Sequence, residues 1–261
     1  MTTDPARLGV SVGITNTRLN AAKRGIAVEL ALRLVASANT PVCLVGADPT
    51  DRDVERRTPE LLEGYEHTVR QISDGTRSLE AVFVPARRLC VVSVPDRAGL
   101  EAVLPELRST FRCVVIDAPS RVGGGVGIAR VLLEHLNVLL VASGLTPGEL
   151  IDARNYVGQF AAIPRAKHVA VRVLTSGHPE DSGMSREQLT RRLGALPVIV
   201  RIPRLWGRIS THAPSEEDLD DAFRPVVDWI VDRVRENDVP PPALRPASLN
   251  DHLAASRYRD A

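Results

Sequence analysis

The stretch "GITNTRLNAAKRGIAVELALRL", residues 13–34, has the layout of a strand that runs into a loop and then into a helix. Residues 8–14 are apolar enough for a buried strand, and apolar residues recur at helical spacing beyond Gly25. Such a loop binds phosphate when its glycines let consecutive backbone N–H groups curl around the phosphate oxygens. Between Gly13 and Gly25, however, the sequence has no glycine. The stretch therefore keeps the layout of a phosphate-binding loop and lacks the residues that form one.

Short apolar runs rich in β-branched residues recur along the rest of the chain. Seven of them predict strands, at residues 8–14, 41–47, 88–94, 113–119, 138–144, 168–175 and 196–203. Because these runs are apolar on both faces, they are typical of a parallel sheet that helices cover on each side.

Segments with helical periodicity alternate with these runs. They predict helices within residues 21–37, 97–111, 148–162, 184–195 and 215–237. In the last segment we expect Pro225 to bend the helix or to mark its true start. The prediction is a doubly wound α/β fold with a mainly parallel, seven-stranded sheet flanked by helices.

One domain accounts for most of the chain. We expect it to span residues 1–237, because the apolar stripe of the last predicted helix ends near Val234. Residues 238–261 begin with "DVPPPALRP", which cannot continue a helix, and we expect a Pro-rich linker and a flexible tail.

Composition limits the classes of function. The formal net charge of +1 gives no overall electrostatic case for nucleic acid or an anionic membrane. No apolar run reaches the roughly 20 residues of a membrane span, and the N-terminus shows no secretory signal. Cys43, Cys90 and Cys113 each lie within an apolar run, so we expect buried thiols and a cytoplasmic protein.

Ligands of doubly wound sheets bind at the carboxyl ends of the strands, and two carboxylates stand there in this sequence. Asp48 follows the second predicted strand, in "VCLVGADPTDRD", and Asp117 lies near the end of the fourth, in "FRCVVIDAPS". An aspartate at a strand end is often structural, because it caps the next turn. The pair together favours a functional site.

These segments, in this order, resemble the MinD/ParA family of deviant-Walker P-loop ATPases, including its atypical CpaE/TadZ-type members. The resemblance covers roughly residues 7–236. Besides the two segments above, three others carry it: "TPELLEGYEHTVRQISDGTRSLEAVFVPA" (58–86), "EHLNVLLVASGLTPGELIDA" (134–153) and "LPVIVRIPRLWGRIS" (196–210). The resemblance implies a P-loop NTPase fold, and it implies short helices across residues 58–86.

The resemblance also implies roles for residues of the loop. When the helix after this loop is aligned with the helix after the family's P-loop, Lys23 corresponds to the phosphate-binding lysine. Arg24 then corresponds to the threonine that holds Mg²⁺. Asn20 tolerates the loop's backbone geometry, and Arg18 is nearest to the lysine that reaches across a dimer. Thr175, after the sixth predicted strand, takes the place of the residue that reads the base. These residues are the candidate cofactor-binding set, with ATP and Mg²⁺ as the cofactors in question.

Asp48 and Asp117 are the candidate catalytic residues in the same comparison, and Asp117 is the candidate metal ligand. The first carboxylate of the family's D-x-D pattern is Gly46 here. Two buried carboxylates close together repel each other and resist burial. We therefore expect Lys23 or Arg24 to turn inward and pair with Asp117 or Asp48, as an internal cation in place of the metal.

Two functions remain open at this stage. One is a positioning or scaffold protein with a degenerate nucleotide site, a pseudo-ATPase in which ATP hydrolysis is weak or lost. The other is an ATPase of chromosome-partitioning or septum-site-determining type that uses Lys23, Asp48 and Asp117. Either function implies protein partners and a homodimer. The arginines of residues 186–208 offer a possible contact with nucleic acid, against the plainer interpretation of a solvated helix face.

The glycine-rich segment "RVGGGVG", residues 121–127, has two interpretations. The resemblance makes it the family's mobile loop that senses the γ-phosphate. The alternative is a relocated phosphate-binding nest, although the G-x-G-x-x-G spacing with a downstream acid is missing.

Overall fold

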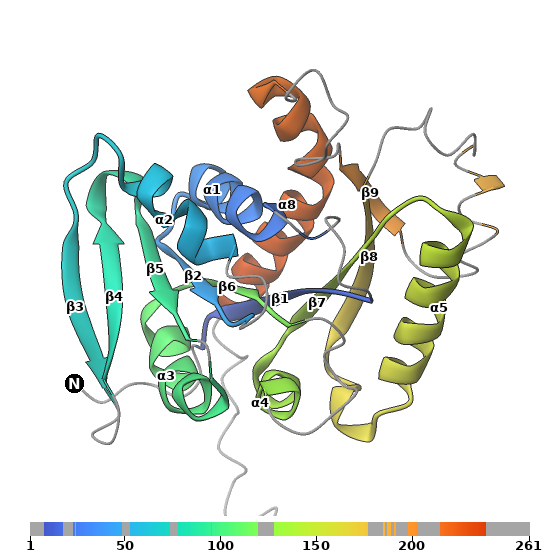
Figure 1. The fold of residues 1–261 in the computed structure, drawn as a ribbon, viewed down its shortest axis with the longest axis horizontal. Coiled ribbons are helices and arrows are strands. Elements are labelled where there is room, and N and C mark those ends of the chain that lie inside the picture. The colour runs from blue at the N-terminus through green and yellow to red at the C-terminus, as the bar shows by residue number, and fades with distance from the viewer. Residues whose placement is uncertain are drawn as a thin grey trace, which may run out of the picture.

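The chain folds as a nine-stranded sheet with helices on both faces (Figure 1). The structure is a computed structural model, and it describes residues 8–17, 23, 25–48, 53–73, 78–94, 96–119, 128–176, 185, 187–188, 191, 198–202 and 215–238. The strand order is β3-β4-β5-β2-β6-β1-β7-β8-β9. The strands are β1 (Val10–Asn16), β2 (Val42–Gly46), β3 (Thr68–Ser73), β4 (Ser78–Val84), β5 (Leu89–Ser93), β6 (Cys113–Asp117), β7 (Val138–Ser143), β8 (Ala170–Ser176) and β9 (Val198–Ile202).

All seven predicted strands are present, but the predicted count of seven is too low. The two additional strands, β3 and β4, pair with each other as an antiparallel hairpin. β4 also pairs antiparallel with β5, so the hairpin lies at one end of the sheet. The remaining neighbours pair in parallel. The sheet is therefore mainly parallel and doubly wound, as the sequence predicts.

The hairpin also corrects the expectation of short helices across residues 58–86. Of the described residues in this range, only 58–62 are α-helical, at the end of α2 (Asp53–Leu62); 68–73 form β3, 78–84 form β4, and Pro85–Arg87 form a 3₁₀ turn. The physical reason lies in the residue types: Thr68, Val69 and Ile72 are β-branched and favour a strand, in which Ile72 packs inward while Val69 lies on the opposite face and stays exposed. The Asp74-Gly75 pair in the sequence is a typical hairpin turn signal.

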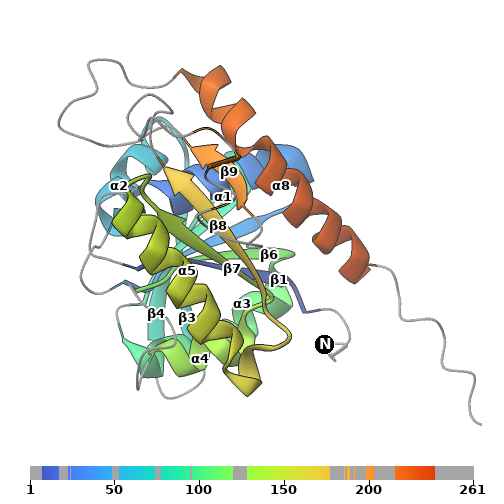
Figure 2. The same cartoon turned by 90° about the vertical axis from the view of Figure 1, so that its right-hand side faces the viewer.

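Two hydrophobic clusters lie on the two faces of the sheet. On one face pack α1 (Ile26–Ala38), α2 and α8 (Glu216–Asp238). On the other face pack α3 (Arg97–Thr110), α4 (Ile128–His135) and α5 (Pro147–Ala161). Figure 2 shows α8 and α5 on opposite sides of the sheet. The three cysteines are buried, free thiols within this core, as predicted.

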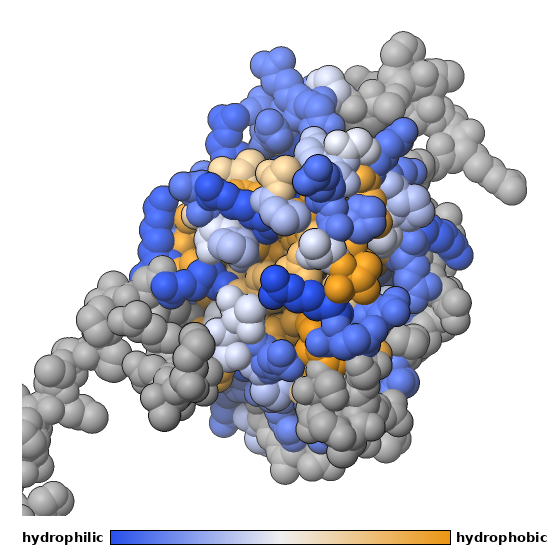
Figure 3. Space-filling model, turned by 90° about the vertical axis from the view of Figure 1, so that its left-hand side faces the viewer, coloured by the Kyte–Doolittle hydropathy of each residue, from blue (hydrophilic) through white to orange (hydrophobic). Residues whose placement is uncertain are grey.

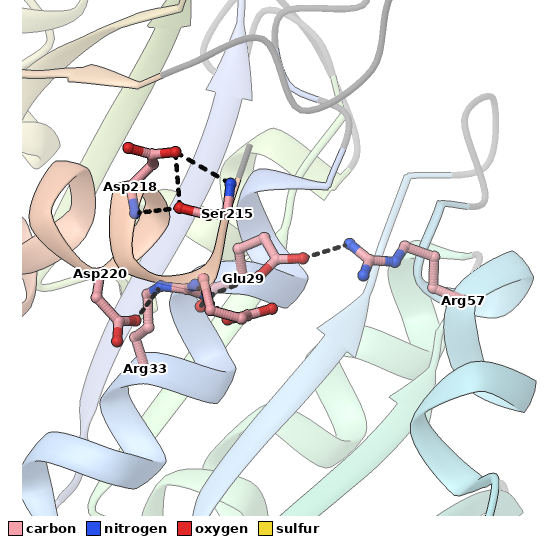
Figure 4. A network of polar contacts seen from close by, with 7 residues as sticks. Glu29, Arg33, Arg57, Ser215, Asp218 and Asp220 are labelled. Carbon is pink, nitrogen blue, oxygen red and sulfur yellow. Dashed lines mark hydrogen bonds and ion pairs between the residues drawn. The ribbon is translucent and has the colours of Figure 1, made fainter. Parts of the chain in front are cut away.

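The last helix differs from the prediction at its start. It begins at Glu216, so Pro225 lies inside α8 and does not mark its beginning. The side chain of Ser215 accepts a hydrogen bond from the backbone N–H of Asp218, and the Asp218 carboxylate accepts one from the backbone N–H of Ser215 (Figure 4). This reciprocal cap satisfies two backbone donors and fixes the first turn of the helix.

A chain of ion pairs joins α1 to α8 and α2 (Figure 4). Arg33 of α1 is buried and pairs with Glu29, one turn earlier, and with Glu216 and Asp220 of α8. Glu29 in turn pairs with Arg57 of α2 at 2.9 Å. The guanidinium of Arg33 also lies 5.4 Å from the centroid of the Phe223 ring. These contacts fix the helix that follows the candidate loop against its neighbours.

None of the helices that the structure describes is both long enough and apolar enough to cross a membrane. The predicted tail, residues 239–261, lies outside the described residues, and so does the glycine-rich segment 121–127.

Candidate nucleotide site

The register of three central strands brings the two candidate carboxylates together. Asp117, the last residue of β6, is in register with Ile14 of β1 and with Gly46 of β2. The sheet continues one step beyond these pairs, because Ala47 N–H donates to the Asp117 carbonyl and Ala118 N–H donates to the Ile14 carbonyl. Asp48 lies two residues beyond Gly46, so it points to the same face of the sheet as Asp117. That face is the one covered by α1.

Lys23 lies between the two carboxylates. Its Nζ is 2.6 Å from Asp48 Oδ2 and 2.8 Å from Asp117 Oδ1, and it donates a third contact to the Ala118 carbonyl oxygen at 2.6 Å. All three charged side chains are buried, with 1%, 1% and 3% of the Lys23, Asp48 and Asp117 side chains exposed. The expected internal cation is therefore present, and it is Lys23.

The electrostatics of Lys23 follow from this geometry. Burial by itself lowers the pKa of the ammonium, but the charges of Asp117 and Asp48, together with their hydrogen bonds, outweigh it. The pKa of Lys23 therefore lies above its ordinary value, and the lysine stays protonated under physiological conditions.

Local structure explains how Lys23 enters the site. Gly25, two residues later, has φ of 75° and precedes α1 as its N-cap. Residues with a Cβ rarely adopt this left-handed conformation, so glycine suits the turn between the loop and the helix. The sequence signal for this turn is a glycine placed directly before an apolar helical pattern.

Gly46 has a steric reason for its place next to the carboxylates. A Cβ at Gly46 would lie 3.1 Å from the Cβ of Val54, which packs from α2 onto the end of β2. Val54 is buried, so it has little freedom to move away. Gly46 stands where the D-x-D pattern has its first aspartate. With α2 packed against the end of β2, this position has no room for a side chain.

The Thr15 hydroxyl joins β1 to the start of the loop after β6, a contact that the sequence did not indicate. The Thr15 hydroxyl donates to the Pro119 carbonyl oxygen at 2.7 Å. Tyr156 of α5 is also hydrogen-bonded to the Thr15 side chain, and burial raises the pKa of its phenol well above the ordinary value. These contacts hold β1, β6 and α5 together beside the Lys23 cluster.

The other predicted site residues do not join Lys23. Thr175 is buried near the carboxyl end of β8, in register with Ser143 of β7, so two strands separate it from β6 in the sheet order. Arg18, Asn20 and Arg24 lie outside the described residues. The structure thus brings together three of the predicted residues, Lys23, Asp48 and Asp117, and adds the Ala118 carbonyl.

Two carboxylates and a carbonyl oxygen are the ligand types that Mg²⁺ prefers. Lys23 already occupies the position between them, and an ammonium and a divalent cation cannot both lie within 3 Å of the same oxygens. Among the described residues no group of three or more His, Cys, Asp or Glu side chains could hold a metal ion. The residues present therefore fit a metal only after Lys23 has moved away.

Comparisons with known proteins bear on the fold alone. No protein-family model matches the chain, and no curated protein matches it by sequence. Solved structures do match, at low sequence identity. Cobyrinic acid a,c-diamide synthase from Mycobacterium smegmatis, with bound ADP and magnesium, aligns with a TM-score of 0.58 and 17% identity over 92% of this chain and 100% of that one.

Two cell-division proteins align similarly. The septum site-determining protein MinD from Pyrococcus horikoshii OT3, complexed with Mg-ADP, gives a TM-score of 0.57 and 13% identity over 89% of this chain and 97% of that one. A MinC:MinD complex from Aquifex aeolicus gives a TM-score of 0.55 and 14% sequence identity over 87% of this chain and 95% of that one. The strand order, the placement of the carboxylates and these alignments agree: the chain has the fold of the MinD/ParA-type P-loop ATPases.

Proposed function

We propose that this protein is a positioning or scaffold protein built on the MinD/ParA-type fold, with a nucleotide site that Lys23 keeps closed. One observation carries the proposal: the Lys23 ammonium lies within 2.8 Å of oxygens of both Asp48 and Asp117 in a buried cluster. In this arrangement the lysine neutralises the two carboxylates, and it is withheld from any phosphate group.

Opening this site has an energetic cost. Separating a buried lysine from its carboxylates leaves uncompensated charges, which destabilises a protein by about 3–5 kcal/mol. A bound nucleotide would have to offset that cost with new contacts. The loop has no glycine between Gly13 and Gly25, so it is poor in the residues that allow a nest of backbone N–H groups around phosphate. We therefore infer a pseudo-ATPase, whose fold serves to present docking surfaces.

The second candidate is an ATPase of chromosome-partitioning or septum-site-determining type. It is favoured by the convergence of Lys23, Asp48 and Asp117 at the carboxyl ends of β1, β2 and β6, where this fold binds ligands. In that function Lys23 would leave the carboxylates to bind phosphate, Asp117 would help hold Mg²⁺, and Asp48 would orient water. Mg²⁺ would supply neutralisation of phosphate charge.

An ATPase assay separates the two candidates. The pseudo-ATPase proposal expects turnover at background with Mg-ATP, unchanged by Asp48→Ala. Asp228→Ala, a change of an exposed aspartate on α8, is the control for preparation and assay. Circular dichroism confirms that each variant is folded. Turnover well above background that Asp48→Ala abolishes and Asp228→Ala leaves intact would establish the ATPase instead.

The partners of the protein are also part of the proposal. A positioning role implies a protein partner and a homodimer, and one structure of the same fold is a MinC:MinD complex. A contact with DNA through the arginines of residues 186–208 is the alternative, and most of these residues lie outside the described part of the chain. Retention on DNA that weakens steeply with added salt would support that contact. Retention that salt leaves unchanged would speak against it.

A further inference from the structure

The outer edge of β3 is an unpaired edge of the sheet. β3 stands at the end of the strand order and pairs only with β4, in a regular register of six residue pairs without a bulge. Its outward-facing backbone N–H and C=O groups have no strand beside them in the described part of the chain. Free edges of this kind readily accept another strand, and proteins usually protect them with lysine, proline or a bulge. Residues 68–73 contain neither lysine nor proline.

The surface around this edge is exposed and partly apolar. Val69 is 55% exposed and Tyr65 is 38% exposed, and both are among the most exposed large apolar side chains of the described residues. Figure 3 looks onto this side of the molecule, where apolar surface lies between hydrophilic side chains. An exposed, regular and partly apolar edge is a typical site for strand addition.

Two opposite charges on this edge indicate what pairs with it. Glu66 and Arg70 are both exposed, and within the described residues neither has an ion-pair partner. The guanidinium of Arg70 instead lies 5.2 Å from the centroid of the Phe83 ring of β4. Because side chains alternate along a strand, Thr68 and Arg70 point to the same side of β3. Glu66 precedes the strand by two residues, so a strand added at this edge that extends β3 by two residues would bring Glu66 to that side as well.

We propose that the edge of β3 pairs antiparallel with the same edge of a second copy of this chain, with Thr68 on the two-fold axis. In this register Glu66 of each copy lies opposite Arg70 of the other, so two ion pairs form by symmetry. Thr68 faces its own counterpart, and Thr–Thr pairs are favourable across antiparallel strands. The interface is isologous, so it closes as a dimer and does not extend into a filament.

This dimer is separate from the nucleotide site. Lys23 and its carboxylates lie around β1, β2 and β6, whereas β3 is the last strand at its end of the sheet. Self-association through β3 is therefore expected without nucleotide and is unchanged by Mg-ATP. The proposal survives or fails independently of whether the protein hydrolyses ATP.

Charge reversal tests the register directly by sedimentation of the full chain. The wild type is expected to dimerise, whereas Glu66→Arg and Arg70→Glu alone each place two like-charge pairs across the axis. Each single variant should therefore dimerise at least about tenfold more weakly than the wild type. An equimolar mixture of the two variants should dimerise again, because the two arginines of the Glu66→Arg chain then face the two glutamates of the Arg70→Glu chain. The double variant Glu66→Arg/Arg70→Glu should also recover.

Asp228→Arg and Arg154→Glu are the matched controls, since both change the charge of an exposed side chain on a helix, α8 or α5, that packs away from β3. Both should dimerise like the wild type. A wild type that stays monomeric at high concentration would overturn the proposal. So would single variants that dimerise like the wild type, or a mixture that fails to recover.

Discussion

Lys23 is the residue on which the account of the site depends. Its ammonium contacts both carboxylates and the Ala118 carbonyl, in a position closed to solvent. Such an arrangement need not add net stability relative to an apolar cluster of the same shape, but removing one member leaves a buried charge without its partner. The lysine therefore has a structural role in the absence of any ligand.

Lys23→Met should destabilise the protein by about 3–5 kcal/mol, because Asp48 and Asp117 then remain buried side by side without a cation. The loss should be smaller at about pH 5 than at pH 8, since one of the repelling carboxyls can then take up a proton. Urea denaturation measures both values. Lys167→Met, at an exposed lysine, should change stability by less than about 0.5 kcal/mol. A Lys23→Met variant as stable as the parent would show that the cluster has no structural role.

The pH dependence of stability provides a second test of Lys23. Its pKa in the folded protein is raised above the ordinary value of 10.5. For a raised lysine pKa, the folded state binds the proton more tightly, so the stabilisation is complete below pH 10.5 and is lost as pH rises through the folded pKa. The difference in unfolding free energy between wild type and Lys23→Met should therefore shrink above that pH. A difference that stays constant through this range would contradict the ion pairs.

The packing of α2 on the end of β2 decides which side chains fit beside the carboxylates. Gly46→Ala should destabilise the domain by about 1–3 kcal/mol, because its Cβ would meet Val54 at 3.1 Å. In a Val54→Ala background the same change should cost less. Gly158→Ala in α5 is the control, since no atom lies within 4 Å of the added Cβ and alanine favours a helix. Equal costs of Gly46→Ala in both backgrounds would rule out the steric explanation.

Much of the architecture could be predicted at the level of elements. The seven short apolar runs became strands because burial on both faces leaves a strong, continuous pattern. β3 and β4 were not predicted, because the expectation for residues 58–86 followed the resemblance, whereas the β-branched residues Thr68, Val69 and Ile72 and the Asp74-Gly75 pair favour a hairpin. The helix α4 was also not predicted, since its eight residues follow a glycine-rich segment that masks the period.

The charged side chains of the site could be predicted from the sequence, whereas the groups around them could not. Two aspartates at strand ends and one lysine before a helix were enough to predict an internal cation. The Ala118 carbonyl and the Thr15–Pro119 contact could not be predicted, because backbone acceptors leave no signal in the residue types. The steric conflict at Gly46 depends on the position of Val54 of α2, which sequence spacing does not specify.

At the scale of the whole molecule, the domain is expected to be complete without the tail. The apolar stripe of α8 packs onto the sheet as far as Val234, and the helix ends at Asp238. Deleting residues 239–261 should therefore shift the melting temperature by no more than a few degrees, as calorimetry can measure. A larger drop would mean that the tail packs on the core.

The central claim is that Lys23 closes the candidate nucleotide site, and calorimetric titration with Mg-ATP tests it most directly. We predict no binding to the wild type at ATP concentrations up to about 1 mM, which corresponds to a binding free energy weaker than about 4 kcal/mol. The Lys23 ion pairs would have to break before the lysine could bind a phosphate group. The loop between Gly13 and Gly25 has no glycine that could form a compensating nest of backbone N–H groups. Micromolar binding of Mg-ATP that Lys23→Met abolishes in a folded variant would contradict the claim and identify a working nucleotide site.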